Sequence, residues 1–378
     1  MLDQNLTGRE RFLSVMEYQP VDRVPNHEVG VWGQTIDRWA EEGLDIHQLH
    51  WDWFTGEEFF DMDAREYISV NFDLLPRFDP ETIEETDRYV IARNDRGILT
   101  KGLVEGASRG MRASMDQYLS FPVTNLADFR EMKKRYNPNQ AARYPPQWRA
   151  QRLPGWKARQ HVLVLGVNCS TTGFYWRARE WMGTEALSYA WYDQPALMHE
   201  MMEFIADFTM AVSRPILEEI APDYVFINED MAMKNGPLLS PKTYRTFIFP
   251  HMRRLVDFYK HYGVRYVLVD TDGNSDALIP LLMDAGVDGI WPMERASDMD
   301  PIQLRKKYGR ALRLWGGVDK RELSKDLPAI DAHLLSLAPL VEDGGFIPTI
   351  DHLAPPDIPL KNFLYYMEKK KRLLRGQL

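Results

Sequence analysis

Side chains with catalytic chemistry stand at the ends of the predicted strands. Carboxylates predominate, and amides, hydroxyls, a thiol and an imidazole accompany them. In a parallel α/β barrel the carboxyl ends of the strands surround the active site, so we expect these groups to meet at one mouth. The segments are Asp73, Asn168-Cys-Ser-Thr-Thr172, Asn228-Glu-Asp230, Asp270-Thr-Asp-Gly-Asn274, Glu294, Gly316-Gly-Val-Asp319 and Asp351-His352.

So many carboxylates at one mouth need compensation. Like charges a few ångströms apart do not all remain ionised without a cation or shifted pKa values. Three solutions are open at this point: a bound metal, a cationic substrate, or a carboxylic acid kept protonated for general-acid chemistry.

Each of these residues also has a structural interpretation. Asp319 and Asp272 are equally well placed to cap the helix that follows, and His352 is as well explained by a structural role. Asp73 precedes Leu-Leu-Pro, and these apolar neighbours favour a functional role. Cys169 is the single cysteine, and a lone cysteine is usually inert. Trp32 belongs to an aromatic-rich N-terminal third that suits core packing better than a ligand pocket.

The elements that position these residues alternate between helix and strand. Thr7 followed by Glu10 predicts a capping box at the start of a helix. An extended segment is expected at 24–31, a helix at about 34–43, and a buried strand that starts at Tyr67 and ends at Asp73. Helical patterns, including 195–220 and 241–261, separate six further predicted strands at 161–167, 223–228, 264–270, 287–291, 311–315 and 346–350.

Eight strands in repeated β–α units favour an α/β fold of the (β/α)8 TIM barrel type. An open doubly wound sheet is the alternative, and the missing Gly-x-Gly-x-x-Gly after the first strand weakens it. We expect one domain over 1–378 with an excursion at about 77–160. Within the excursion, 89–93 and 98–101 flank Asn94-Asp-Arg-Gly97, which predicts a β-hairpin.

Composition narrows the class of protein. The chain has 378 residues, 44% of them hydrophobic, and a net charge of -9. The one basic run, Lys369-Lys-Lys-Arg372, is expected to be a solvated helix face, so we predict no nucleic-acid partner. The apolar runs have strand length and predict no membrane span. A start without a secretory signal and a single cysteine together predict a cytoplasmic protein.

The motifs in their order resemble the uroporphyrinogen decarboxylase superfamily from Arg9 onward. Phe72-Asp-Leu-Leu-Pro76 is similar to the motif of the catalytic aspartate, and Asp351-His-Leu-Ala-Pro-Pro-Asp357 to the C-terminal histidine motif. The resemblance therefore implies catalytic roles for Asp73 and His352. It places Asp230 at the position of the family's serine, and either Phe174 or Tyr175 at that of its tyrosine.

The sequence also departs from this family. Decarboxylases of uroporphyrinogen carry an Arg-Gln-Ala-Gly-Arg motif that grips the substrate's carboxylates. Here the region reads Val29-Gly-Val-Trp-Gly-Gln-Thr-Ile-Asp-Arg38, with Arg38 as its one cation. An acidic mouth without paired arginines is a poor receptor for a polycarboxylate, which argues against haem biosynthesis.

The same superfamily contains corrinoid-dependent methyltransferases. Its coenzyme M branch holds zinc with a His-x-Cys motif, where this chain has Asp270-Thr-Asp-Gly-Asn274. The branches that act on methoxy-aromatic compounds or methylamines fit the acidic, aromatic-rich character better. The sequence contains no Asp-x-His-x-x-Gly cobalamin motif, so a corrinoid would come on a partner protein. Family analogy also suggests a homodimer.

We therefore assign the following expected roles. Catalysis is expected from Asp73, His352, Asp230 and Tyr175. Substrate contacts are expected from Trp32, Asn168, Glu294 and Phe174. Glu229, Asp270 and Asp272 are the candidate ligands of a divalent metal such as zinc, which would act as a Lewis acid.

Three functions follow from these assignments. The first is a corrinoid-linked methyltransferase acting on a small methylated substrate. The second is a decarboxylase of uroporphyrinogen or another acid, and the third is a non-catalytic binding protein on the same fold. If the site is placed correctly, Asp73→Asn should nearly abolish activity and leave folding intact.

Overall fold

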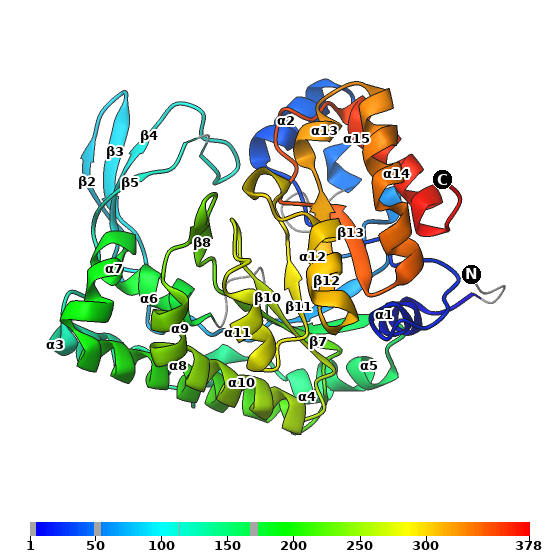
Figure 1. The fold of residues 1–378 in the computed structure, drawn as a ribbon. Helices are drawn as coiled ribbons and strands as arrows, with labels where there is room; N and C mark the ends of the chain where they lie inside the picture. The colour runs from blue at the N-terminus through cyan, green and yellow to red at the C-terminus, as the bar shows by residue number, and fades with distance from the viewer. Residues whose placement is uncertain (1–4, 49–53, 113, 167–172) are drawn as a thin grey trace.

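A curled sheet of parallel strands forms the body of the protein (Figure 1). The computed structural model describes residues 5–48, 54–112, 114–166 and 173–378. The strands pair in the order β1-β6-β7-β10-β11-β12-β13, so each neighbour follows in chain order, as in a TIM-barrel-like fold. Their bounds are β1 (Arg65–Ile68), β6 (Val162–Leu165), β7 (Tyr224–Asn228), β10 (Tyr266–Asp270), β11 (Gly289–Trp291), β12 (Arg313–Val318) and β13 (Phe346–Ile350).

The strand predicted at 24–31 is an extended segment that forms no β-ladder. It makes one parallel bridge, from Val31 to Ala354. The backbone N–H of Ala354 donates to Gly30 at 3.0 Å, and that of Asp63 donates to Asn26 at 2.9 Å. The segment 24–31 thus lies between the chain that follows β13 and the chain that precedes β1. Pro25 lacks an N–H, which limits regular pairing here.

A buried ion pair fastens this closing segment to the C-terminal helix. The carboxylate of Glu28 accepts bonds from Ile350 N at 2.9 Å, from the hydroxyl of Tyr366 and from Lys370. Lys370 is 0% exposed. Burial lowers its pKa, and Glu28 opposes that shift. The prediction that 369–372 is a solvated face is therefore wrong for Lys370, because the helix turns this side chain inward.

Helices surround the sheet, and those predicted at about 34–43 and 195–220 are found as Gly33–Glu41 and Pro195–Leu217. The predicted helix at 241–261 is divided at Ile248, because Pro250 cannot donate in the first turn of the second piece. The bounds are α1 (Gly8–Met16), α2 (Gly33–Glu41), α3 (Leu126–Lys133), α4 (Trp148–Gln151), α5 (Leu153–Ala158), α6 (Phe174–Met182), α7 (Thr184–Asp193), α8 (Pro195–Leu217), α9 (Pro241–Phe247), α10 (Phe249–His261), α11 (Ile279–Asp284), α12 (Pro301–Tyr308), α13 (Lys320–Leu323), α14 (Leu327–Asp343) and α15 (Leu360–Leu374).

Aromatic rings pack α1 against the barrel. The ring of Phe12 lies 5.4 Å from that of Tyr224 and 5.9 Å from that of Trp315, measured between centroids. Every residue of β6, β7, β10 and β13 is buried, which is why these strands read as continuous apolar runs.

The capping box of α1 gives a small, testable contribution to stability. Glu10 N donates to Thr7 Oγ1 at 3.2 Å, and Thr7 N donates to Glu10 Oε2 at 2.9 Å. Thr7→Ala is expected to lower the free energy of unfolding by about 1 kcal/mol. Urea denaturation measures the loss. Thr246→Ala is the matched control, because the exposed Thr246 hydroxyl only donates back to Lys242 O within α9. Equal losses in the two variants would contradict the capping role.

The predicted hairpin is part of a larger antiparallel sheet that projects beside α6 and α7 (Figure 1). The order is β2-β3-β4-β5, with bounds β2 (Glu81–Glu85), β3 (Tyr89–Arg93), β4 (Leu99–Leu103) and β5 (Gln117–Ser120). The two outer strands were not predicted. All of their residues are exposed, so no alternation of apolar and polar residues marks them.

The predicted strand from Tyr67 to Asp73 ends early, at Ile68. Beyond Ile68 the chain leaves the barrel and bonds to the excursion instead. Asn71 N donates to Arg143 O at 2.7 Å, and Leu75 N donates to Arg135 O at 2.7 Å. Asp73 therefore lies on a loop between the barrel and the excursion.

Across the described ranges, no helix combines the length and the apolar character that a membrane span requires.

Candidate active site

An imidazole–carboxylate pair lies at the carboxyl ends of the barrel strands. His352 follows β13 and Asp272 follows β10, and His352 Nε2 is 3.5 Å from Asp272 Oδ2. Burial lowers the pKa of His352, but the bond and charge of Asp272 outweigh it, and the net shift is upward from 6.5. The indole of Trp32 lies 6.3 Å from the imidazole, between centroids. The pair thus presents a proton donor beside an aromatic surface.

A second pair stands at the end of β7. Asp230, with a φ of 40°, accepts a short hydrogen bond from Arg179 of α6. Burial raises the pKa of Asp230, Arg179 opposes the shift, and the charge of Asp272 adds to it. Asp230 is thus close enough to interact electrostatically with both members of the first pair, Asp272 and His352.

A third pair joins the loops after β11 and β12. Lys320 Nζ is 3.0 Å from Glu294 Oε1 and 4.0 Å from Asp351 Oδ1. Glu294 also accepts a bond from Gly273 N at 3.0 Å. The carboxylate of Asp351 is fully buried and accepts bonds from Arg295 N and Lys320 N, so it fixes both loops.

These pairs bear on the expectation that the acidic mouth needs compensation. Three carboxylates at the strand ends each pair with a cation: Arg179 for Asp230, Lys320 for Glu294, and His352 for Asp272. The compensation comes from side chains of the protein, so the carboxylates do not by themselves call for a metal or a cationic substrate.

Glu229 points away from this group. Its carboxylate is 0% exposed and accepts a bond from Tyr175 N at 2.7 Å, at the amino end of α6. Burial raises its pKa to about 7, and backbone N–H groups of α6 oppose that shift. Gly173 makes this approach possible, because a Cβ there would lie 1.4 Å from Asn228 O.

The expected metal ligands are not gathered as a set. Among the described residues, no group of three or more His, Cys, Asp and Glu side chains is arranged to hold a metal ion. Glu229 caps α6, while Asp272 faces His352. Asp270 is buried at the end of β10, where its backbone oxygen accepts a bond from Glu229 N. These placements do not support Glu229, Asp270 and Asp272 as ligands of one ion.

The two aspartates with an open capping role have different positions. Asp319 caps α13, accepting a bond from Arg321 N at 2.9 Å, and also binds the Arg321 guanidinium. Asp272 caps no helix, because α11 begins only at Ile279. The structural interpretation is confirmed for Asp319, whereas Asp272 belongs to the site.

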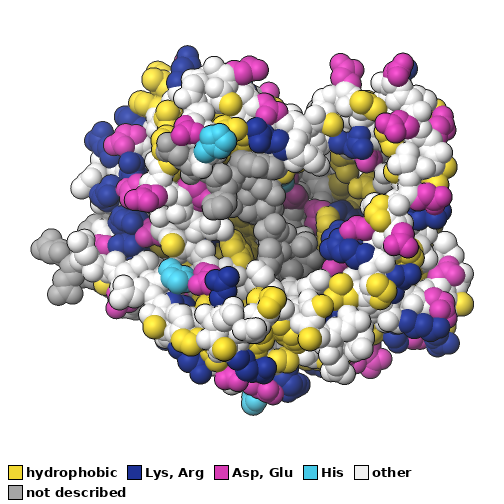
Figure 2. All heavy atoms as spheres, turned by 180° about the vertical axis from the view of Figure 1, so that it is seen from behind, with side chains coloured by type: hydrophobic (Ala, Val, Ile, Leu, Met, Phe, Trp, Pro, Cys, Tyr) yellow, Lys and Arg dark blue, Asp and Glu magenta, His cyan; other side chains and the backbone are white. Residues whose placement is uncertain are grey.

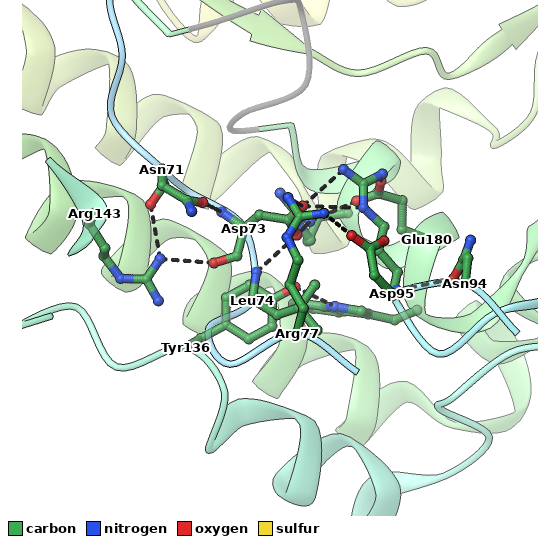
Figure 3. A network of polar contacts seen from close by, with 12 residues as sticks. Asn71, Asp73, Leu74, Arg77, Asn94, Asp95, Tyr136, Arg143 and Glu180 are labelled. Carbon is green, nitrogen blue, oxygen red and sulfur yellow. Dashed lines mark hydrogen bonds and ion pairs between the residues drawn. The ribbon is translucent and has the colours of Figure 1, made fainter. Parts of the chain in front are cut away.

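Asp73 is held in a network of arginines (Figure 3). Its carboxylate lies 3.1 Å from Arg177 Nη1, 2.9 Å from Arg96 Nη2 and 3.4 Å from Arg77 Nη2. Burial opposes ionisation of Asp73, but Arg177 and Arg96 outweigh it and lower the pKa. Glu180 of α6 bonds to both Arg177 and Arg96. This network ties α6 to the excursion.

The remaining expected residues have less accessible positions. Phe174 and Tyr175 are both 0% exposed in the structure. Burial raises the pKa of Tyr175 to about 12, and its buried hydroxyl has no hydrogen-bond partner among the residues that the structure describes. Their roles toward a substrate stay predictions. Asn168 and Cys169 lie outside the described residues.

The sequence reading missed the cations. Arg177 and Arg179 stand on α6, Lys320 starts α13, and Arg96 lies in the β3–β4 turn. These cations stand on helices and in a turn, where the pattern of polar residues at strand ends does not mark them. Arg177 and Arg179, just beyond the segment from which the family's tyrosine was expected, were the available signal.

The barrel and the projecting sheet enclose a deep hollow (Figure 2). Acidic and basic side chains both lie along its rim. In this view the sheet β2–β5 forms one wall, and the body of the barrel forms the other.

Comparisons with known proteins show the family and the fold of this chain. A family model described as uroporphyrinogen decarboxylase (URO-D) matches residues 111–373. A solved methyltransferase from Methanosarcina mazei is similar with 15% identity and a TM-score of 0.58, covering 97% of this chain and 100% of its own. That likeness shows a shared fold. A 2,3-dimethylmalate lyase of the PEP mutase/isocitrate lyase superfamily covers 99% of this chain and 87% of its own at 13% identity, but its TM-score of 0.29 carries no argument. No curated protein matches the chain.

Proposed function

Since the chain belongs to the uroporphyrinogen decarboxylase family, we propose that it is a methyltransferase that passes the methyl group of a small methoxy-aromatic compound or methylamine to a corrinoid on a separate protein. The observation that carries the proposal is the His352–Asp272 pair beside Trp32. A methylated oxygen or nitrogen leaves readily only when it receives a proton, and this pair presents one next to an aromatic surface.

The residues of this chain then have separate tasks. Trp32 packs against the substrate, and His352 donates a proton to the leaving atom as its bond to the methyl carbon breaks. Asp272 orients the imidazole and stabilises its charged form. The reduced corrinoid, when bound, supplies the nucleophile that accepts the methyl group. The methyltransferase from Methanosarcina mazei supports the proposal to the extent that this fold accommodates methyl transfer.

An anaerobic assay tests the proposal. The purified protein is mixed with free cob(I)alamin and a panel of methoxy-aromatic compounds, methylamines and methyl thioethers. We expect the absorption band of methylcobalamin to grow with at least one donor. If the protein is folded and the methylcobalamin band grows with no donor, the methyltransferase proposal is overturned.

The pH dependence gives a sharper test of the proton donor. Methyl transfer requires protonated His352, so kcat is highest below its pKa and is lost as the pH rises through it. Because Asp272 raises that pKa above 6.5, activity should persist beyond pH 6.5. In Asp272→Asn the loss should move to lower pH. Identical midpoints in the two kcat profiles would contradict the role of the pair.

A decarboxylase is the second candidate, and the cations around the mouth favour it. Arg179, Lys320 and His352 stand around the mouth and provide positive charge for a carboxylate. In that reaction the bond to the carboxyl carbon breaks, carbon dioxide leaves, and His352 protonates the carbon that keeps the electron pair. Release of carbon dioxide from porphyrinogens or other acids, without methyl transfer, would select this function.

A further inference from the structure

The loop between β4 and β5 reaches from the projecting sheet toward α2 (Figure 1). Its tip, residues 106–111, is called the arch below. Gln34 Nε2 donates to Gly106 O at 3.0 Å and to Met111 O at 3.2 Å. Asp37 accepts a short bond from the Ser108 hydroxyl and a 3.0 Å bond from Arg109 Nε. The first two turns of α2 therefore fasten the arch.

The arch is built to dock closely. Ser108 and Met111 exchange both backbone hydrogen bonds at 2.8 Å. Arg109 and Gly110 between them have φ values of 50° and 80°, as a tight two-residue turn requires. A Cβ on Gly33 would lie 2.7 Å from Ser108 O, so only glycine allows this backbone contact.

The docking point adjoins the proton donor. Trp32, whose indole lies near His352, is the residue immediately before Gly33. Thr35 Oγ1 donates at 2.8 Å to the backbone oxygen of Ala354, two residues after His352. One end of α2 thus contacts the arch and the chain that carries the imidazole. The projecting sheet is also fastened at its β3–β4 turn, where Arg96 pairs with Glu180 of α6.

We propose that the arch is a size filter for the cleft and that Asp37 is the positioning residue that keeps it closed. Fastened to α2, the arch joins the two walls of the cleft and restricts the opening above Trp32 and His352. The fastening contacts are a third to a half exposed, with 33% of the Arg109 side chain and 47% of the Asp37 side chain accessible. Such contacts are individually weak, so the arch opens without unfolding of the barrel.

Limited trypsin digestion tests the fastening and does not depend on any activity. Trypsin cleaves after Arg109 only when the turn is released. Asp37→Ala is expected to speed this cleavage about fivefold, the factor that loss of one half-exposed ion pair produces. Mass spectrometry distinguishes this cut from those after Lys101 and Arg112. Glu41→Ala, an equal charge change at an exposed site on the same helix, should leave the rate unchanged.

Acylation of His352 tests the filter itself, again without reference to methyl transfer. Diethyl pyrocarbonate is a small histidine reagent, and di-tert-butyl dicarbonate is a bulky one. Peptide mapping gives the rate at His352 for each reagent. In Asp37→Ala the ratio of the bulky to the small rate is expected to rise about fivefold, in step with trypsin cleavage. An unchanged ratio, or cleavage no faster than in Glu41→Ala, would overturn the proposal.

Discussion

Replacing Asp73 by Asn is expected to lower the free energy of unfolding by about 3 kcal/mol, because it leaves the buried Arg177 and the partly buried Arg96 without their shared carboxylate. Arg177 is 6% exposed at its side chain and Asp73 is 11% exposed. Glu180 still pairs with Arg177 and Arg96 in the variant, which keeps the expected loss at the lower end for a buried ion pair. The loop between the barrel and the excursion should loosen with it.

Urea denaturation of the two proteins at neutral pH measures this loss. Asp95→Asn is the matched control, because Asp95 binds Arg77 at the exposed edge of the same network. Its loss should stay below about 1 kcal/mol. Asp73 has a lowered pKa, so its contribution is present above its ordinary value of 3.8 and is lost as the pH falls through the folded-state value. If Asp73→Asn unfolded at the wild-type urea concentration, the arginines would not depend on this carboxylate.

This expectation changes how Asp73→Asn tests catalysis. From the sequence, Asp73 stood before an apolar Leu-Leu-Pro, and the variant was expected to spare folding. In the structure the surroundings of its carboxylate are guanidinium groups. A loss of activity in Asp73→Asn therefore has two sources, and a catalytic role requires activity measured on a variant that is shown to be folded.

The barrel strands were predictable because burial on both faces leaves a direct trace in composition. Val225 to Ile227 and Val267 to Val269 are continuous apolar runs, and these two strands, β7 and β10, fall within two residues of the predicted bounds. β2 left no such trace, since its Glu-Thr-Ile-Glu-Glu sequence is exposed throughout. Its pairing with β3, across the short connection 86–88, makes it a strand, and the exposed side chains carry no sign of that pairing.

For the candidate site, the sequence predicts where the polar residues lie along the chain but not which partners they meet. A strand end is a local property, and Asp230, Asp272 and His352 do follow the carboxyl ends of β7, β10 and β13 as the pattern predicts. Which partner each side chain meets depends on how loops and helices from distant segments converge. Arg179 reaches Asp230 across 51 positions in the chain, and Lys320 reaches Glu294 across 26. Lys370 shows the same limit, because nothing in the basic run 369–372 indicates that this one lysine is buried.

Replacing His352 by Asn is expected to lower kcat about 10²- to 10⁴-fold, the range for loss of a positioned general acid. The variant should fold normally, because 29% of the His352 side chain is exposed and its bond to Asp272 is a long 3.5 Å. Asn keeps a polar amide near Trp32 but does not titrate, so the dependence of the residual rate on the pKa of His352 should disappear. Initial rates of methyl transfer with saturating donor measure the effect.

His161→Asn is the control that isolates this chemistry. His161 also pairs with a carboxylate, Glu66 at 2.8 Å, but it precedes β6 at the opposite ends of the strands. Removing an imidazole–carboxylate pair there should leave kcat within about twofold, since no substrate meets it. If both variants lost activity alike, the effect would be one of stability. If His352→Asn kept the wild-type rate, the leaving atom would receive its proton from another group, and the pair beside Trp32 would not be the centre of the reaction.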